Sequence, residues 1–297
     1  MGYMHIENLY QNQIILSSRR CYALEKVHGT SAHVGFVGKT DASGAVVDGV
    51  LTFFSGGASH DRFVELFDLM ALTAAFIALG HPAVTVYGEA YGGKEQGMSA
   101  TYGKSLAFIA FDVDIDDKWL DVPKALDVAT KLGLEFVPFA EGPTDLEWLN
   151  AQRDAPSEVA VRRGITEPRE REGVVLRPIC EVTLNNGNRV IAKHKGDQFR
   201  ETKSPRVVDP AKAEALACAT SIADEWVTEM RLTHVLDKIT ATGPEHIPAV
   251  IAAMIEDVVR ESAGEIVDSR DARKAIGAAT ARLFQARLKR RMFEAPR

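Results

Sequence analysis

Apolar and polar residues alternate through most of the first two-thirds of the chain, in short runs bounded by glycine-rich turns. The first runs are "CYALEKVHG", "SAHVGFVG" and "GVLTFFSGG", with the turn-rich "KTDASG" before the third. The runs "AVTVYGEAYGG" and "SLAFIAFDVDI" follow, and "EGVVLRP" and "NRVIAKHKG" come last, with "NNGN" as the turn between them. A period of two residues is typical of strands that bury one face. The pattern therefore predicts a strand-rich region.

Helical spacing interrupts the strands at three places. Ser59 is a candidate N-cap for a helix that starts at His60 and stops at Gly80. The run "VPKALDVATKLG" predicts a short helix ended by Gly133, and "TDLEWLNAQ" predicts another, capped by Thr144. We expect these helices to pack among the strands.

The composition changes after "ETKSPRVVDP", a segment with two prolines that can serve as a linker. Apolar residues then recur at spacings of three and four over residues 211–231, 245–262 and 268–292, with "TGPEH" as a break. The sequence therefore predicts an α+β domain over residues 1–205 and a small all-helical domain over residues 206–297.

Composition narrows the class of protein. The 297 residues are 46% apolar and 26% charged, as in an ordinary globular protein. The cysteines Cys21, Cys180 and Cys218 form no CxxC pair, and no signal-peptide pattern opens the chain, so we expect a cytoplasmic protein. The longest apolar run, "LMALTAAFIALG", is shorter than the ~20 residues of a membrane span, and we expect no membrane partner.

Charge is unevenly distributed along the chain. The formal net charge is −6, which argues mildly against a protein coated by nucleic acid. Residues 267–297 nevertheless contain nine Lys or Arg and three acidic residues. This basic segment is either a solvated helix face or a surface that contacts the phosphates of a nucleic acid.

One apparent phosphate-binding motif is incomplete. Gly88, Gly93 and Lys94 match the start of a P-loop, but Glu95 stands where a serine or threonine should hold Mg²⁺. No helix-forming run follows directly, so the helix N-terminus that normally faces the phosphates is also missing. We reject this motif as a nucleotide site.

A lysine near a predicted strand end is a stronger candidate. Lys26 lies in "ALEKVHGTS", three residues before Gly29, which permits close approach of another group. A lysine can act as a nucleophile once its pKa is lowered. An isolated K-x-x-G is more often a solvent-facing lysine beside a turn, so the assignment depends on other residues.

Three further stretches supply matching chemistry. Glu89 lies between glycines at a predicted strand end, and Glu172 begins the apolar strand "EGVVLRP". Lys193 and Lys195 are two residues apart, so both lie on one face of a strand. Such a pair usually marks a solvated edge. Together with a nucleophilic lysine and two carboxylates, however, the pair fits nucleotide transfer to Lys26, because cations neutralise the phosphates and a carboxylate can position Mg²⁺.

These stretches resemble the conserved motifs of covalent nucleotidyltransferases. "EKVHGTS", "VYGEAYG", "FIAFDV", "EGVVLRP" and "NNGNRVIAKHK" occur in the order of motifs I, III, IIIa, IV and V. They are most similar to the phage RNA ligase 2 family, which includes the RNA-editing ligases. The resemblance covers roughly residues 20–202 and implies a nucleotidyltransferase fold, similar to ATP-grasp, of antiparallel sheets with flanking helices.

The resemblance implies a role for each motif residue. Lys26 would carry AMP, and Glu25, His28 and Gly29 would flank it in the ATP-binding pocket. Glu89 would hold the ribose, and Phe111 would stack on the adenine. Glu172 would assist the metal-dependent step, and Lys193 and Lys195 would contact the α-phosphate.

The sequence departs from the family at two positions. Family members often carry a basic residue in the strand that here reads "TFFSGG", and Arg62 is our candidate for its end-sensing role. Ser31 stands where an asparagine is common.

The sequence-based hypothesis is an ATP-dependent RNA ligase that uses ATP and Mg²⁺, with Mn²⁺ as a substitute metal. It would act as a monomer on 5′-phosphate and 3′-hydroxyl RNA ends, held in a duplex. One alternative is a GTP-dependent capping guanylyltransferase, which the predicted helical tail disfavours because such enzymes normally carry an OB-fold. A second alternative is a non-catalytic protein that binds nucleic-acid ends.

Overall fold

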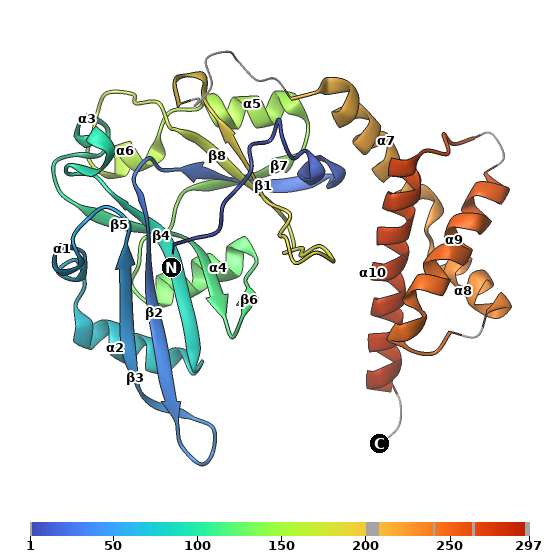
Figure 1. Cartoon of the computed structure of the whole chain (residues 1–297), viewed down its shortest axis with the longest axis horizontal. Helices are drawn as coiled ribbons and strands as arrows, with labels where there is room; N and C mark the ends of the chain where they lie inside the picture. The colour runs from blue at the N-terminus through green and yellow to red at the C-terminus, as the bar shows by residue number, and fades with distance from the viewer. Residues whose placement is uncertain (1, 200–207, 240, 263–264, 295–297) are drawn as a thin grey trace. The chain divides into compact units, whose positions relative to one another are not determined.

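The computed structural model describes residues 2–199, 208–239, 241–262 and 265–294 (Figure 1). The chain divides into two compact units. The first comprises Met1–Ile15 and Arg20–Val207, and the second comprises Leu16–Arg19 and Val208–Arg297. The boundary that we predicted between residues 205 and 206 lies outside the described residues.

The first unit is built on two antiparallel sheets, which confirms the predicted α+β class. The four-stranded sheet has the order β7-β1-β8-β9, and the five-stranded sheet has the order β3-β2-β4-β5-β6. The strands of the first sheet are β1 (Arg20–Lys26), β7 (Phe139–Pro143), β8 (Gly173–Pro178) and β9 (Ala192–Lys195). Those of the second are β2 (Thr30–Thr40), β3 (Val46–Ser55), β4 (Ala83–Tyr91), β5 (Ala107–Ile115) and β6 (Lys118–Trp119).

Helices flank these sheets (Figure 1). The α-helices of the first unit are α1 (His60–Val64), α2 (Leu69–Leu79), α3 (Ser99–Tyr102), α4 (Val122–Lys131), α5 (Leu146–Asp154) and α6 (Glu158–Arg162). Short 3₁₀ turns are η1 (Ile14–Ser17), η2 (Glu95–Gly97) and η3 (Asp197–Phe199).

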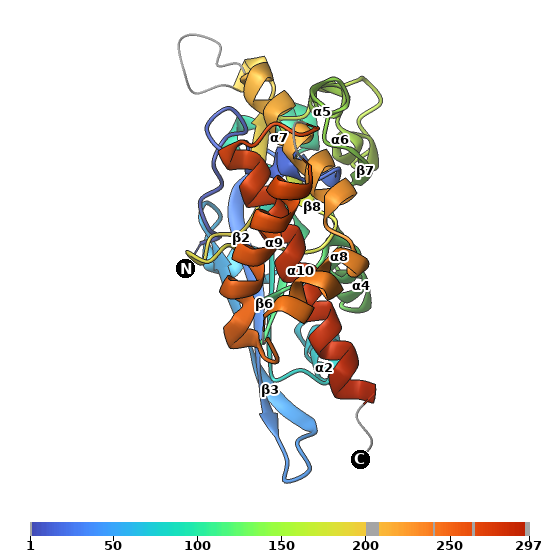
Figure 2. The same cartoon turned by 90° about the vertical axis from the view of Figure 1, so that its right-hand side faces the viewer.

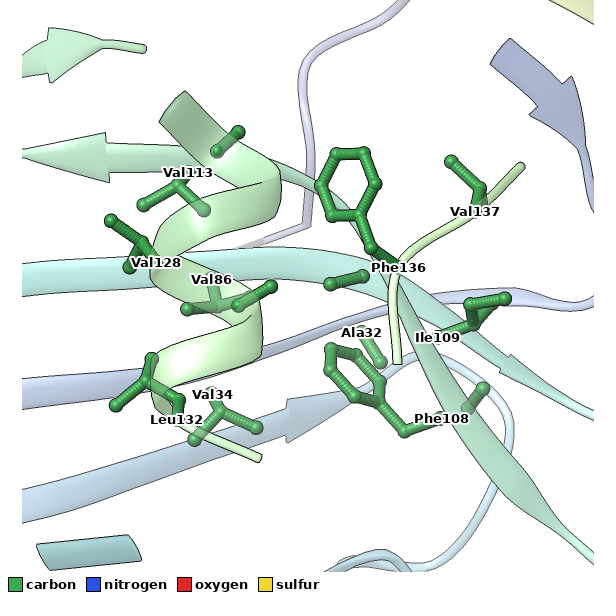
Figure 3. Close-up of a cluster of buried hydrophobic side chains, with 14 of the residues drawn as sticks. Ala32, Val34, Val86, Phe108, Ile109, Val113, Val128, Leu132, Phe136 and Val137 are labelled. Atoms are coloured by element: carbon green, nitrogen blue, oxygen red, sulfur yellow. The ribbon is translucent and has the colours of Figure 1, made fainter. Parts of the chain in front are cut away.

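The core of the first unit lies between α4 and the five-stranded sheet. Figure 3 shows Val128 of α4, and Leu132 directly after this helix, facing valines of β2, β4 and β5. This arrangement follows from sequence, because α4 places apolar residues on one helical face and the strands place them on alternate positions.

Two helix boundaries differ from the sequence-based prediction. The helix expected from His60 to Gly80 is two helices, because Asp68 accepts hydrogen bonds from the backbone amides of Met70 and Ala71 and thereby starts α2. Helix α5 is capped by Asp145, whose carboxylate accepts from Trp148 N, rather than by Thr144. In both cases the helix starts at an aspartate, because aspartate is a stronger N-cap than threonine or the apolar residues that surround it.

The strand predictions were also incomplete. The strand expected over "NRVIAKHKG" is shorter, since β9 begins at Ala192 and residues 179–191 form the connection from β8. The loop predicted between β4 and β5 contains η2 and α3. Strands β6 and β7 were not predicted, because each is too short or too mixed in polarity for a period of two to be visible.

The second unit is helical, as predicted (Figures 1 and 2). Its helices are α7 (Pro210–Trp226), α8 (Glu229–Lys238), α9 (Ile247–Glu261) and α10 (Arg270–Glu294), with a 3₁₀ turn η4 (Pro244–His246) at the predicted break. The helix expected over 211–231 ends at Trp226, because Thr228 caps a separate α8 through Arg231 N. Figure 2 shows α10 extending past the shorter helices, and its contacts are with α7, α8 and α9.

The second unit has its own apolar core. Val250, Met254 and Val258 of α9 pack with Ile276 and Phe284 of α10, and all five side chains are buried. Across the parts of the chain that the structure describes, no helix combines the length and apolarity that a membrane span requires.

Candidate active site

Lys26 is the last residue of β1, and the next turn brings the chain against β4. Its register partner is Gly173 at the start of β8. A Cβ atom on Gly29 would lie 2.4 Å from the carbonyl oxygen of Ala90 and 2.9 Å from Cγ of Glu89. Only glycine fits there, so Gly29 allows the segment after Lys26 to approach the strand that carries Glu89.

Glu172 is the centre of the cationic cluster around Lys26. One carboxylate oxygen, Oε2, lies 2.9 Å from Lys26 Nζ and 3.0 Å from His28 Nδ1. The other oxygen, Oε1, lies 2.9 Å from Lys195 Nζ. The Glu172 side chain is only 2% exposed. Burial alone would raise its pKa, but hydrogen bonds from His28, Lys26 and Lys195 and the charge of Lys26 outweigh burial and lower the pKa to about 2. Glu172 is therefore a fixed anion.

Glu89 is the second carboxylate near Lys26, and its environment acts in the opposite direction. Burial raises the pKa of Glu89 to about 7, although the charge of Lys26 and a hydrogen bond from Gly29 oppose the change. The Gly29 amide donates to Glu89 Oε1 over 3.2 Å. Near neutral pH this carboxyl group is thus partly protonated, whereas Glu172 is ionised.

A cavity of about 390 Å³ opens beside Lys26. Its lining includes Lys26, Glu89, Phe111 and Lys193. Lys193 therefore faces the cavity, and Lys195, two residues on along β9, contacts Glu172. The shared strand face that we predicted for the two lysines thus points toward Lys26 rather than along a solvated sheet edge. Glu172 and Lys195 are not lining residues and adjoin the cavity through Lys26, while the cavity itself presents the Phe111 ring, the Glu89 carboxylate and the amines of Lys26 and Lys193. This combination suits a nucleotide.

Two of the site residues predicted from the sequence, Glu25 and Arg62, do not point their side chains at Lys26. Glu25 borders the cavity, but its carboxylate accepts from Ser157 Oγ, the N-cap of α6, at 2.5 Å and from Glu158 N at 2.9 Å, so it is bound to the first turn of α6. Burial raises the pKa of Glu25, and the hydrogen bond from Ser157 and the charge of Arg171 oppose that effect. Arg62 is exposed on α1 and is absent from the cavity lining. The end-sensing role of Arg62 stays a prediction.

Sequence reasoning missed a buried ionic cluster at the inner wall of the cavity. Asp112 of β5 accepts from Arg177 Nη1 at 2.8 Å and from Arg189 Nη1 at 2.6 Å, and all three side chains are at most 2% exposed. Tyr3 donates to Asp112 Oδ2, and its ring meets Phe111 edge-on at 4.9 Å. Because Arg177 is in β8 and Asp112 in β5, the cluster joins the two sheets. The available signal was Arg177, a charged residue inside the apolar run "EGVVLRP".

The chain segment before β1 forms another wall that was not predicted. Tyr3, Met4, His5 and Ile6 line the cavity. The backbone of this segment pairs with β9, since Lys193 N donates to Glu7 O at 2.9 Å and Leu9 N donates to Lys193 O at 2.8 Å. The same backbone contacts therefore hold Lys193 in place.

The protein groups available to a divalent metal are few. Glu172 touches Lys26 directly, and Glu89 interacts with it through charge. Among the described residues, no group of three or more His, Cys, Asp or Glu side chains is placed to hold a metal ion. Mg²⁺ in phosphate-binding sites commonly takes one or two carboxylates together with substrate phosphates, and a site of this composition fits that pattern.

Comparison with known proteins identifies the family. The family model for RNA ligase matches residues 19–195, which include β1, β9 and the site residues between them. Among solved structures, the chain resembles a Naegleria gruberi RNA ligase mutant with AMP and Mn, with 15% identity and a TM-score of 0.48 over 67% of this chain and 57% of that one. The same enzyme with pyrophosphate matches with 16% identity and a TM-score of 0.47, again over 67% and 57%. The chain thus aligns with less than two-thirds of the length of these relatives. Because the family match spans more than half of the sequence, the chain belongs to the RNA ligase family.

Proposed function

We propose that this protein is an ATP-dependent RNA ligase that joins a 3′-hydroxyl to a 5′-phosphate through a lysyl-AMP at Lys26. The observation that carries the proposal is the position of Lys26 Nζ, which is 2.9 Å from Glu172 and borders a cavity lined by Phe111, Glu89 and Lys193. The relatives from Naegleria gruberi, solved with AMP, ATP and Mn, support ATP and a divalent metal as ligands.

In the first step Lys26 Nζ, once deprotonated, attacks the α-phosphorus of ATP. A nitrogen–phosphorus bond forms, and the bond to the pyrophosphate leaving group breaks. Glu172 is too weak a base to take the proton of Lys26, given its pKa of about 2. We infer that Glu172 instead keeps Nζ at the cavity edge, while Lys193 and Lys195 offset the negative charge that builds on the α-phosphate.

The remaining residues position the nucleotide. The Phe111 ring stacks on the adenine, and its orientation is fixed by the edge-on contact with Tyr3. Glu89 accepts from the ribose hydroxyls in its ionised form. His28 stands beside Lys26 and shares Glu172 Oε2 with it. Holding the reacting atoms in one geometry supplies much of the rate in phosphoryl transfer.

The later steps are two further displacements at phosphorus. An oxygen of the RNA 5′-phosphate attacks the phosphorus of lysyl-AMP, which frees Lys26 and forms a 5′–5′ pyrophosphate. The 3′-hydroxyl of the second strand then attacks the RNA phosphorus and releases AMP, so that one phosphodiester bond forms for each ATP cleaved to AMP and pyrophosphate. A divalent metal, held by Glu172 and phosphate oxygens, would neutralise charge on the phosphates.

The proposal also covers the cellular compartment and the oligomeric state. The cysteines Cys21, Cys180 and Cys218 are free, as in proteins of the reducing cytoplasm. We also propose that the protein acts as a monomer on RNA ends that are held in a duplex.

Labelling with radioactive nucleotides tests the proposal. The purified protein is incubated with Mg²⁺ and α-labelled ATP or GTP, then denatured and separated by electrophoresis. We expect covalent label from ATP only, no label in Lys26→Ala, and normal label in Lys94→Ala, which removes the exposed lysine of the rejected P-loop motif. Label from GTP alone would indicate a capping-type enzyme, and absence of label from either nucleotide would indicate a binding protein.

A further inference from the structure

Charge is sorted by sign among the helices of the second unit. Helices α7, α8 and α9 together contain four Lys or Arg and eight Asp or Glu. Residues 270–290 of α10 contain seven Lys or Arg and one acidic residue, Asp271. Mixed signs on each helix are the usual solution for a solvated surface. The segregation of basic residues on α10 therefore calls for a specific cause.

Part of the positive charge on α10 is neutralised within the protein. Arg273 forms two hydrogen bonds with the carboxylate of Asp268, at 2.7 and 2.6 Å. Arg290 pairs with Glu229 of α8, and Arg287 donates to Thr233 Oγ1 at 2.7 Å. These three side chains serve the packing or the electrostatics of the unit itself.

The other four cations form an exposed row. Arg270, Lys274, Arg282 and Lys289 are exposed, and none has an ion pair with the described acidic side chains. At 100° per residue they fall within about a third of the helix circumference, and a rise of about 1.5 Å per residue spreads them over about 28 Å. The row is therefore a line of cations along one face of a single rigid helix. We call it the α10 basic row.

We propose that the α10 basic row binds the phosphate backbone of the RNA substrate. A nucleic-acid strand presents phosphates every few ångströms along its length, so a linear row of cations can contact several of them at once. The net charge of the whole chain is −6, so the α10 basic row is a local positive surface on a negatively charged protein. Contacts of this kind position a nucleic acid without reading its sequence. The inference rests on the proposed function, because an RNA ligase needs a long polyanionic substrate.

Two charge-matched double variants of the full chain test this inference. Arg282→Gln/Lys289→Gln removes two members of the row, and Arg273→Gln/Arg290→Gln removes two paired arginines from the same helix. Both variants lower the net charge by the same amount. Binding of a nicked RNA duplex is followed by fluorescence anisotropy across a series of salt concentrations. Circular dichroism melts verify that the variants remain folded.

The row variant should bind about tenfold or more weakly at moderate salt. The slope of log K against log salt should fall by about 1.4 to 1.8, which is about 0.7 to 0.9 for each of the two lost phosphate contacts. The paired-arginine variant should change the slope by less than about half of that. Equal effects of the two variants, or none from the row variant, would overturn the proposal. Covalent labelling with ATP is measured in parallel and should be unchanged in both variants. If the wild-type protein itself forms no covalent label with ATP, the proposed ligase function is wrong, whatever the RNA-binding result.

Discussion

Replacing Glu172 by glutamine tests the electrostatic account of the site. The pKa of Glu172 falls from 4.5 to about 2 in the folded protein, a depression of about 2.5 pH units. At about 1.36 kcal/mol per unit, the ionised carboxylate contributes about 3 kcal/mol to the free energy of unfolding. Glutamine has the same shape without the charge, and it leaves Lys26, His28 and Lys195 without their counter-ion. We expect Glu172→Gln to lose about 3 kcal/mol at pH 7.

The pH dependence gives the sign of the effect. A carboxylate with a depressed pKa stabilises the protein above its unfolded pKa of 4.5, and the contribution is lost as the pH falls toward 2. The difference between wild type and Glu172→Gln should therefore be largest near pH 7 and fall to about half by pH 3.

Urea denaturation followed by tryptophan fluorescence measures this difference. The background is Trp226→Phe, because Trp119 and Trp148 then report on the first unit alone. Glu158→Gln is the matched control, since the Glu158 side chain is 65% exposed and lies 3.7 Å from Arg171, and it should change stability by less than about 0.5 kcal/mol. A loss below about 1 kcal/mol in Glu172→Gln, or an equal loss at pH 7 and pH 3, would refute the assignment of Glu172 as a fixed anion.

Further predictions concern catalysis and binding. Lys193→Ala and Lys195→Ala should each slow lysyl-AMP formation by about 10²-fold in a rapid-quench assay, because each removes a cation that we propose offsets charge on the α-phosphate. Wild-type rates would instead indicate that the pair is only a solvated edge. A nonreactive ATP analogue should bind more tightly as the pH rises from 6 to 8, because Glu89 has a pKa of about 7 and the ribose contact that we propose for it requires the ionised form. Calorimetry on Glu89→Gln should show a flatter pH profile, and an unchanged profile would exclude this role. A chain truncated after Arg206 should still form lysyl-AMP but lose most nick sealing, and full sealing by the truncated chain would make the helical unit dispensable.

The chemistry of the site was more predictable than its walls. Lys26, Glu172 and Lys195 were singled out from short motifs, and in the structure Lys26 and Lys195 both lie within hydrogen-bonding distance of Glu172. Their roles in catalysis stay a prediction. A motif carries such information because a few adjacent residues determine both the chemistry and the local strand end. The direction of the Glu25 carboxylate was not predictable, since it depends on α6, whose first residues lie more than 130 positions away.

The buried cluster shows why the rest of the fold was not predictable from the sequence. Asp112 and Arg177 are 65 positions apart, and Tyr3 and Arg189 are 186 apart. Charged residues are usually exposed, so nothing in the local sequence marks these residues as buried. They become partners only because the two sheets approach each other. The predicted starts of two helices were wrong for a local reason. Asp68 and Asp145 cap these helices, and the spacing of apolar residues does not show which of several neighbouring polar residues is the cap.

The cluster around Asp112 also has a thermal consequence. The stabilisation that apolar contacts give per unit area levels off as the temperature rises, whereas the penalty for removing charges from water falls. A junction between β5 and β8 that depends on Arg177 and Asp112 should therefore hold its geometry better on warming than an apolar junction of the same area. We therefore expect the wall behind the candidate adenine site to keep its geometry on heating, so that loss of the nucleotide site should coincide with global unfolding of the first unit.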